Sequence, residues 1–444
     1  MEWTSGILLG LGGYLLIVTM LHFLFPEPHL DWSKVNLDNI AMPEGFVWGV
    51  ATASHQIEGD NTNNWTQFEQ REGKQQSGKA CDHWNLWAKD HELLSQLGVD
   101  SYRFSIEWSR IEPVQGEWNE AAIEVYSQMI DSLIARGIEP MITLHHFSHP
   151  VWFEDLGGFY HRENLVYFQN YCKKLFPYFS SRVTKWCTVN EPDVFSIMGY
   201  HMGMFPPGQR SPIKAIRVMK NVMIAHGEVY HELKQMSPES YIGLAKNVTI
   251  FDPYRRWNLL HWLTSFAINY IWNGAIISAL KKGRMYGVSV KNVKNSADFI
   301  GLNYYTHVLT SPFLPQTTEI DLPSRTHETV TEFGYPMYAE GLERASKWLG
   351  KLNLPIEITE NGVADKEDNL RPKHLKRHLW IIAKLIKEGV DIKSYYHWSL
   401  MDNFEWAEGY TMRFGLYHVD YETQTRTLRT SGKAYQSIIK RHQK

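Results

Sequence analysis

Two spacings of apolar residues alternate along most of this 444-residue chain. After Pro43, short runs rich in β-branched and aromatic residues are separated by segments in which apolar residues recur every three to four positions. These are the patterns of strands and of amphipathic helices. Ala121–Arg136 and Arg371–Lys387 have the helical spacing, and Gly137 and Gly389 follow them as helix stops.

The eight strand-like runs are Phe46–Ser54, Ser101–Trp108, Glu139–Phe147, Thr184–Glu191, Tyr241–Val248, Asp298–Tyr305, Pro355–Gly362 and Ile392–Leu400. Eight strand–helix units predict a closed parallel barrel of the α/β class, the (β/α)8 or TIM barrel.

The other segments give no sign of a second folded domain. Asn61–Lys79, Pro206–Pro212 and Ser311–Tyr335 are irregular and are predicted to be loops. The sequence has no internal repeat, no Ser/Gly-rich linker and no shift in composition. Because one α/β barrel can exceed the length of an average domain, we predict a single barrel over residues 31–444.

Residues 1–30 have a different pattern. The chain carries no Asp, Glu, Lys or Arg between Glu2 and Glu27, and Gly6–Phe25 is almost wholly apolar. Twenty helical residues at ~1.5 Å each span roughly 30 Å, which matches the hydrocarbon core of a bilayer. A cleaved signal peptide fits less well, because there is no basic n-region and no A-x-A site. We therefore predict an N-terminal membrane anchor. A hydrophobic helix docked on the barrel and a misassigned start are the alternatives, and the charges that flank the segment do not indicate its orientation.

Composition and charge narrow the range of partners. Aromatic residues make up 14% of the chain, including 17 Trp, and such rings are common in clefts that bind sugars. The net charge of −3 and the scattered Lys and Arg residues argue against a nucleic-acid partner. Cys81, Cys172 and Cys187 form no C-x-x-C pair and are predicted to be buried thiols. They favour a reducing compartment, and hence the cytoplasmic side. The sequence does not indicate an oligomeric state.

Candidate site residues lie where the predicted strands end, because barrel chemistry takes place at the C-terminal ends of the strands. The residues that end the eight runs are Gln56, Glu107 with Trp108, His146, Asn190 with Glu191, Lys246 with Asn247, Tyr305, Glu360 and Trp398. Glu191 and Glu360 end the fourth and seventh runs and would face each other across the barrel mouth. Two carboxyl groups on opposite faces of a sugar are what cleavage of a glycosidic bond needs. The alternative is that either glutamate is a solvated residue of the rim.

Several segments of the sequence resemble one enzyme family. Thr188–Pro192 (TVNEP) and Ile358–Gly362 (ITENG) resemble the acid/base and nucleophile signatures of glycoside hydrolase family one, the β-glucosidase/β-galactosidase family. Phe46–Glu58, Tyr102–Arg110, Gly301–Tyr305 and Trp398–Trp406 resemble other segments of the family, in its order. Ser77–Trp84 (SGKACDHW) and Thr143–Phe147 (TLHHF) are most similar to the compact, membrane-associated β-glycosidases of hyperthermophilic archaea.

This resemblance implies roles for residues of this chain. Glu191 would be the acid/base and Glu360 the nucleophile, held anionic and oriented by Arg103 and Tyr305. Asn190 would hydrogen-bond the 2-hydroxyl of the sugar, and Trp398 would be the floor under the ring. The remaining hydroxyls would be bound by Gln56, His146, Glu405 and Trp406.

Two further positions bear on the choice of sugar. A carboxylate at Glu405 suits neutral hydroxyls and disfavours a sugar phosphate. Phe147 stands where the family usually has an indole, which leaves the exact hexose open.

The expected function is that of a retaining β-glycosidase that hydrolyses β-glycosides of neutral hexoses by double displacement, with alkyl or lipid-like glycosides as a candidate class. One alternative is a membrane-bound transglycosidase that acts on glycolipids and uses the same two glutamates. Another is a non-catalytic sugar-binding protein, which predicts the loss of one carboxyl group.

Catalysis by two carboxyl groups needs no cofactor, and the sequence contains no H-E-x-x-H, P-loop or paired-cysteine motif. The expected partners are a small-molecule β-glycoside and the membrane. Glucose, galactose, mannose and fucose remain open as the sugar.

Overall fold

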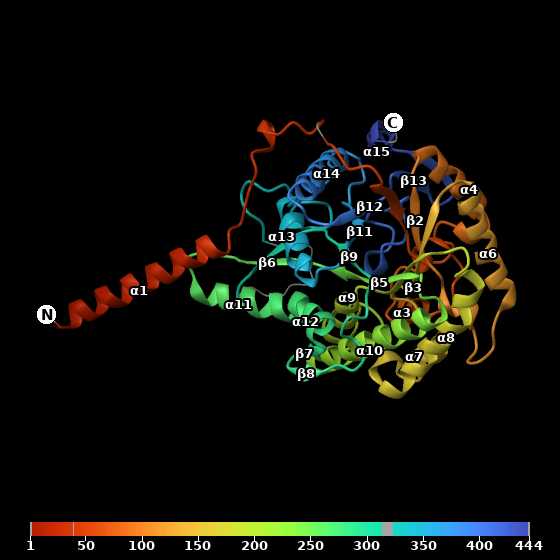
Figure 1. Ribbon diagram of the computed structural model, residues 1–444, viewed down its shortest axis with the longest axis horizontal. Helices are drawn as coiled ribbons and strands as arrows, with labels where there is room; N and C mark the ends of the chain where they lie inside the picture. Colours follow the sequence, from red (N-terminus) through yellow and green to blue (C-terminus); the bar gives the residue numbers. More distant parts are fainter. Residues whose placement is uncertain (1, 39, 313–322, 443–444) are drawn as a thin grey trace.

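The eight predicted strand runs form one closed parallel barrel in the computed structural model (Figure 1). The model describes residues 2–38, 40–312 and 323–442, with side chains from Leu9 onward. Around the barrel the order is β1 (Val47–Ala51), β12 (Ile392–Trp398), β11 (Ile356–Asn361), β9 (Phe299–Asn303), β5 (Tyr241–Asn247), β4 (Lys185–Asn190), β3 (Glu139–His145) and β2 (Ser101–Ser105). Each strand lies within its predicted run, so the (β/α)8 prediction is confirmed.

Helices surround the barrel on its outer side (Figure 1). Their bounds are α2 (Ser54–Ile57), α3 (Asn64–Arg71), α4 (His83–Leu97), α5 (Trp108–Ile111), α6 (Glu120–Ala135), α7 (Val151–Asp155), α8 (Leu165–Phe179), α9 (Pro192–Ile197), α10 (Pro212–Met236), α11 (Leu259–Asn269), α12 (Ala275–Lys282), α13 (Glu340–Leu349), α14 (Arg371–Lys387) and α15 (Thr430–His442). The predicted helices correspond to α6 and α14 within one residue. In the described part of the chain, three small sheets lie outside the barrel and pair β6 (Ile250–Pro253) with β10 (His307–Thr310), β7 (Arg284–Met285) with β8 (Val288–Ser289), and β13 (Tyr417–Asp420) with β14 (Thr425–Leu428).

The core lies between the barrel strands and the helices that cover them. Strand residues such as Val50, Ile142 and Leu244 are fully buried, as are Leu133 of α6 and Leu379 of α14. Side chains of successive strand residues point to opposite sides of the sheet. Apolar strand residues therefore pack against the helices, while polar residues of the same strands can point inward and toward the mouth.

One predicted loop is wrong, because Asn61–Lys79 contains α3. Asn63 caps this helix by accepting hydrogen bonds from the backbone of Trp65 and Thr66, and the Thr66 hydroxyl accepts one from the backbone N–H of Asn63. Only Trp65 and Phe68 supply an apolar face. A capping box with two apolar residues is too short a pattern for periodicity alone to find. The other predicted loops contain no helix or strand over 206–211 or in the described part of Ser311–Tyr335, of which 313–322 lie outside the described residues.

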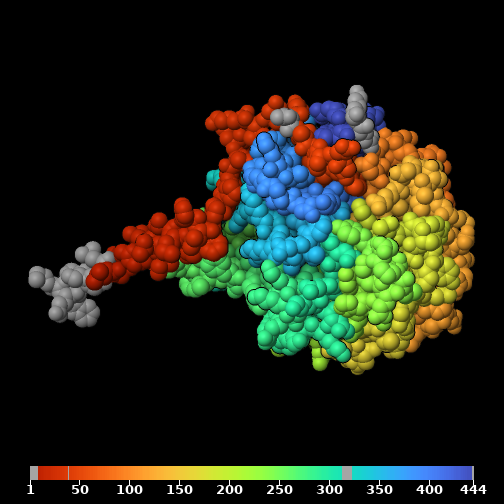
Figure 2. Space-filling model, in the orientation of Figure 1, coloured from red at the N-terminus to blue at the C-terminus, as the bar shows by residue number. Residues whose placement is uncertain are grey.

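The N-terminal segment is helical, as its apolar pattern predicts. α1 (Glu2–Leu24) projects from one side of the barrel (Figures 1 and 2). Among the described residues, the helical run Leu259–Lys282 is long and apolar enough to cross a membrane, and Leu9–Leu24 is a shorter apolar helix.

Candidate active site

Nine of the ten residues proposed from the sequence lie at the C-terminal ends of the barrel strands or in the segments that follow, and Arg103 lies in the middle of β2. The side chains of Arg103, Glu360, Asn190 and Glu191 are at least 95% buried. A network of hydrogen bonds and ring contacts joins the whole set. Its members are Gln56, Arg103, His146, Asn190, Glu191, Tyr305, Glu360, Trp398, Glu405 and Trp406.

Glu360 is held by two strong donors. Arg103 Nη1 lies 2.6 Å from its Oε1, and the Tyr305 hydroxyl donates to its Oε2 at 2.7 Å. Arg103 is itself fixed, because its Nε donates to the Thr143 hydroxyl at 3.1 Å. Hydrogen bonds from charged groups are about twice as strong as neutral ones. Both carboxylate oxygens of Glu360 are therefore occupied and the group is rigidly oriented.

Glu191 has a different environment, in which neutral amides are the donors. Its Oε1 accepts hydrogen bonds from Asn303 Nδ2 at 2.8 Å and from Asn247 Nδ2 at 3.1 Å. The backbone at Glu191 has φ of +44°, and Pro192 then begins α9. A left-handed conformation is rare for a residue with a side chain and is typical of functional positions.

Asn303 is a site residue to which the sequence analysis gave no role. It ends β9 and is the register partner of Glu360 in β11. Its Nδ2 lies 3.1 Å from Asn190 Oδ1, and its Oδ1 accepts from the Thr359 hydroxyl at 2.6 Å. Asn190 in turn accepts from Arg103 Nη2 at 2.6 Å. Asn303 lies in the Gly301–Tyr305 segment, so its position at a strand end was the available signal.

The pKa values of the two glutamates follow from these environments. Burial raises the pKa of Glu191 from 4.5 to about 8, and repulsion from Glu360 adds to the rise. Burial also raises the pKa of Glu360, but Arg103 and Tyr305 oppose that rise. No cation hydrogen-bonds the described oxygens of Glu191, so Glu360 ionises first and Glu191 keeps its proton to higher pH.

Aromatic rings and polar groups form a second part of the site. The ring of His146 stacks on two indoles, with centroids 5.8 Å from Trp398 and 5.9 Å from Trp406. Asn190 Nδ2 lies 3.0 Å from His146 Nε2, and the pKa of His146 is well below its usual value because the ring is buried. The amide is a donor, so we assign the proton of this neutral ring to Nδ1. Phe147 packs its ring 5.1 Å from that of Trp406.

Gln56 and Glu405 lie side by side in this part of the site. Gln56 Nε2 donates to Glu405 Oε2 at 3.2 Å and to the carbonyl of Phe404 at 2.9 Å. Burial raises the pKa of Glu405 to about 8, opposed by the hydrogen bond from Gln56. Among the described residues, Gln56 Oε1 and His146 Nδ1 are buried without a hydrogen-bond partner. Buried polar atoms are usually paired, so these two are available to a ligand.

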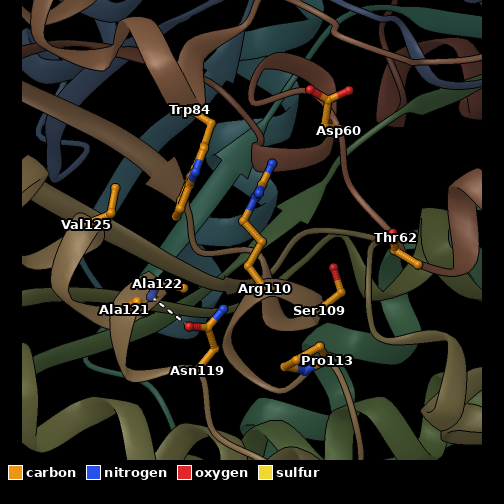
Figure 3. A pocket seen from close by; sticks show the side chains of 10 residues that line it. All are labelled: Asp60, Thr62, Trp84, Ser109, Arg110, Pro113, Asn119, Ala121, Ala122 and Val125. Atoms are coloured by element: carbon orange, nitrogen blue, oxygen red, sulfur yellow. Dashed lines mark hydrogen bonds between the residues drawn. The ribbon is translucent and has the colours of Figure 1, made fainter.

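Other features of the molecule lie away from the glutamates. A cavity of about 400 Å³ is lined by Trp84, Arg110 and Asn119, among others (Figure 3). Neither Glu191 nor Glu360 lines it, so we do not assign the chemistry to it. The predicted buried thiols are confirmed, since Cys81, Cys172 and Cys187 are buried and free.

The chain is similar to proteins that are named β-glucosidases and β-glycosidases. Residues 38–444 match the family model "Glycosyl hydrolase family 1". Beta-glucosidase A of Thermotoga maritima is 35% identical over 440 residues, which cover 90% of this chain and 97% of that protein. A β-glycosidase structure from Pyrococcus horikoshii is 38% identical, with a TM-score of 0.84, and the match covers 90% of this chain and 95% of that one. The T. maritima β-glucosidase in complex with glucoimidazole is 33% identical, with a TM-score of 0.85, over 91% and 99% of the two chains.

The barrel, the paired glutamates and these relatives define a glycoside hydrolase of the β-glucosidase type. The chain belongs to glycosyl hydrolase family 1.

Proposed function

We propose that this enzyme is a retaining β-glycosidase that hydrolyses β-glycosides of neutral hexoses, with Glu360 as nucleophile and Glu191 as acid/base. The observation that carries the proposal is the unequal environment of the two carboxyl groups. Glu360 accepts from a guanidinium and a phenol, whereas Glu191 accepts from two amides. A nucleophile must be ionised and a general acid must carry a proton, and these environments favour those two states.

The two steps follow from the same electrostatics. In the first step Glu360 attacks C1 of the sugar, while Glu191 gives its proton to the oxygen of the leaving aglycone. The esterified Glu360 then carries no charge, so the repulsion that helps to raise the pKa of Glu191 disappears. Glu191 can now accept a proton from the water that attacks C1 and releases the sugar. Each attack inverts C1, so the product keeps the β configuration.

The sugar would be oriented by the groups that line the rest of the mouth. Asn190 contacts Arg103 and His146, and it would bind the 2-hydroxyl. The unpaired Gln56 Oε1 would accept from one hydroxyl, and His146 Nδ1–H would donate to another. Trp398 and Trp406 offer ring faces for the C–H surface of the sugar. Glu405 contacts Gln56 and Trp398, neither of which is cationic, so a sugar phosphate is disfavoured.

The stereochemistry of the product tests this assignment. Metal-free enzyme should convert an aryl β-glucoside first to β-glucose, as seen in the proton NMR spectrum before mutarotation. If α-glucose appeared first, Glu360 would not be a nucleophile.

We further propose that α1 anchors the enzyme to a membrane. Most of its described side chains point into the surroundings, with Leu9 78% exposed and Phe23 86% exposed. A helix that is apolar on nearly all sides is typical of a hydrocarbon environment. The buried free thiols favour the cytoplasmic face.

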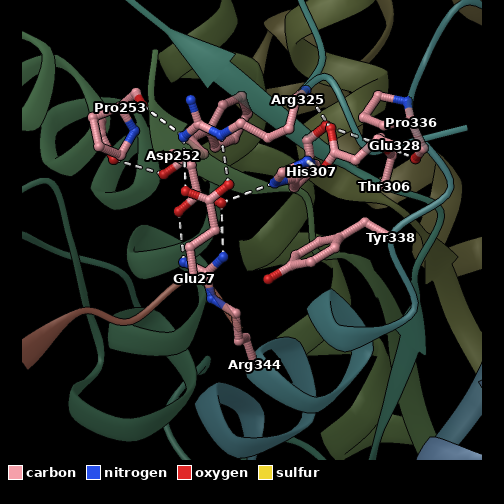
Figure 4. A network of polar contacts seen from close by, with 12 residues as sticks. Glu27, Asp252, Pro253, Thr306, His307, Arg325, Glu328, Pro336, Tyr338 and Arg344 are labelled. Carbon is pink, nitrogen blue, oxygen red and sulfur yellow. Dashed lines mark hydrogen bonds and ion pairs between the residues drawn. The ribbon is translucent and has the colours of Figure 1, made fainter. Parts of the chain in front are cut away.

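The segment after α1 is fixed to the barrel, so the anchor ends before it. Glu27 accepts from Arg325 Nε at 2.8 Å and from Arg325 Nη2 at 2.7 Å (Figure 4). Arg256 Nη1 lies 3.2 Å from its Oε2. The backbone N–H of Leu30 donates to Glu340 at 2.7 Å. Within the predicted segment 1–30, we therefore assign the anchor to Glu2–Leu24 and treat residues 27–30 as part of the barrel.

An enzyme held this close to a bilayer would meet amphiphilic glycosides. Each aglycone methylene that the mouth buried would contribute about 0.8 kcal/mol. Activity should therefore rise from butyl to octyl β-glucoside, and flat or falling values would remove the lipid-like substrate from the proposal. Product analysis with and without a glycolipid acceptor separates hydrolysis from the transglycosidase alternative.

A further inference from the structure

A second stretch of the chain shares the composition of α1. From Trp257 to Leu280 there is no Asp, Glu, Lys or Arg. This stretch folds as α11, a π-helical turn (Tyr270–Gly274) and α12. Ala275 and Ile276 of α12 are fully buried. The stretch is therefore held in the barrel wall and cannot cross a bilayer as a free helix.

The outward side of α11 is apolar, the reverse of the usual arrangement of a surface helix. Exposed apolar residues follow one another at intervals of three, three, seven and one, from just before α11 into the π-helical turn after it. They are Trp257 (58% exposed), Leu260 (52%), Leu263 (63%), Tyr270 (48%) and Ile271 (43%), which we call the α11 face. Scattered single apolar residues are normal on a surface, but a contiguous set of this kind marks an interaction site.

The α11 face lies next to α1. The Tyr14 hydroxyl donates to the carbonyl of Trp257. The ring of Phe25, just after α1, lies 4.9 Å from that of Phe266 and 6.1 Å from that of Trp262. The face is therefore continuous with the segment that we propose to be in the membrane. A protein partner that covered one side would leave most of α1 exposed, whereas lipid would cover both.

The charges around the α11 face also fit a lipid surface. Arg255 precedes it, Lys281 and Lys282 follow it, and the chain has no Asp or Glu between Asp252 and Asp298. Arg256 also precedes the face, but its charge is paired with Glu27. Asp252 is buried, so it does not offset these cations at the surface. Apolar and aromatic side chains flanked by Lys and Arg are typical of segments that lie in the interface of an anionic bilayer.

We propose that the α11 face is a second membrane-contact surface, which lies in the headgroup region of an anionic bilayer and sets the orientation of the barrel. This inference rests on the proposed anchor, because α1 brings the face to the membrane.

The α11 face is also close to Glu191, the proposed acid/base. Trp272, directly after Ile271, donates from Nε1 to Asn247 Oδ1 at 3.4 Å, and Asn247 donates to Glu191. The mouth would open beside the lipid surface, so that an amphiphilic β-glycoside could enter while its aglycone stayed in the bilayer.

Site-specific labelling of the full-length chain tests this inference. The native cysteines are buried, so a single Leu263→Cys variant can carry an environment-sensitive fluorophore at the α11 face. Ile134→Cys on α6 is the matched control, because Ile134 is 42% exposed and α6 lies on the side of the barrel away from α1 (Figure 1). With phosphatidylcholine vesicles containing phosphatidylglycerol, the label at 263 should shift to the blue and be quenched by lipids that carry a shallow spin label. The label at 134 should show neither change. Both variants should hydrolyse nitrophenyl β-glucoside like the unlabelled enzyme.

The outcomes separate the two proposals. If the full-length enzyme does not sediment with vesicles, the anchor is wrong and the α11 face loses its basis. If the enzyme sediments but the label at 263 stays in water, the anchor stands and the α11 face is overturned. A blue shift that depends on protein concentration and needs no lipid would identify a second copy of the chain as the occupant, which also overturns the proposal.

Discussion

Arg103 Nη1 lies 2.6 Å from Glu360 Oε1, and the other terminal nitrogen of Arg103 lies 2.6 Å from Asn190 Oδ1. One guanidinium thus orients the proposed nucleophile and the amide proposed to bind the 2-hydroxyl. A lysine has a single terminal nitrogen and cannot reproduce this fork. We expect Arg103→Lys to lower kcat/KM for nitrophenyl β-glucoside by about 10²-fold, because both partners lose their fixed positions. A folded variant with nearly wild-type kcat/KM would contradict this role.

Removal of the Glu360 side chain should stop hydrolysis but leave the protonated Glu191 in place. In Glu360→Gly, a small anion such as azide can occupy the vacated space and attack C1 directly. We expect azide to restore turnover of an activated aryl β-glucoside and to give the α-glycosyl azide, as identified by proton NMR. A β-glycosyl azide would mean that Glu360 is not the group on that face.

The acid role of Glu191 can be separated from general damage by the choice of leaving group. We expect Glu191→Ala to lose ~10²–10⁴-fold in activity on alkyl β-glucosides, whose aglycones need a proton to leave. Dinitrophenyl β-glucoside needs little acid help, so its first turnover should remain as a burst of phenolate. Equal losses on both substrates would remove the acid role.

The sequence predicted the barrel because each strand run carries its own apolar pattern and has a polar residue at or near its end. It also placed Glu191 and Glu360 at strand ends, where the structure has them. The contact of Asn303 with Glu191 could not be predicted, since it depends on the register of β9 with β5 and β11. α3 was missed because only Trp65 and Phe68 mark its buried side. The bonds of Glu27 to Arg325 and Arg256 join segments far apart in the chain, so the sequence placed Glu27 with the anchor.

The pKa of Glu191 predicts how activity depends on pH. Because this pKa is raised to about 8, kcat/KM should fall above about pH 8, where the free enzyme loses the proton of Glu191. At Glu191 the folded enzyme binds more protons than the unfolded chain, so this group contributes less stability as pH rises from 4.5 toward 8.

Asn303 donates a hydrogen bond to the ionised form of Glu191 and lowers the pKa of Glu191. Asn303→Ala should therefore move the basic limb of kcat/KM to higher pH, and a move to lower pH would contradict this assignment.

The contacts of Glu27 predict that residues 2–24 can be removed without loss of stability. Its side chain is only 4% exposed and accepts hydrogen bonds from Arg325 and Arg256. Burial raises the pKa of Glu27, but hydrogen bonds from His29 and Arg325 and the charge of Arg325 hold it well below its usual value. A chain without residues 2–24 keeps these bonds, whereas Glu27→Gln leaves two guanidinium groups without their counter-charge. Breaking a buried ion pair costs about 3–5 kcal/mol, and we expect the low end because both arginines keep some contact with solvent.

Thermal unfolding of the full-length chain in detergent should show this loss for Glu27→Gln. The matched variant Glu2→Gln and the chain lacking residues 2–24 should unfold near the wild-type temperature. The contribution of Glu27 exists above its unfolded pKa of 4.5 and is lost as pH falls through its lower folded pKa, so the wild type and Glu27→Gln should converge in acid. Equal unfolding temperatures at neutral pH would show that Glu27 does not hold this segment to the barrel.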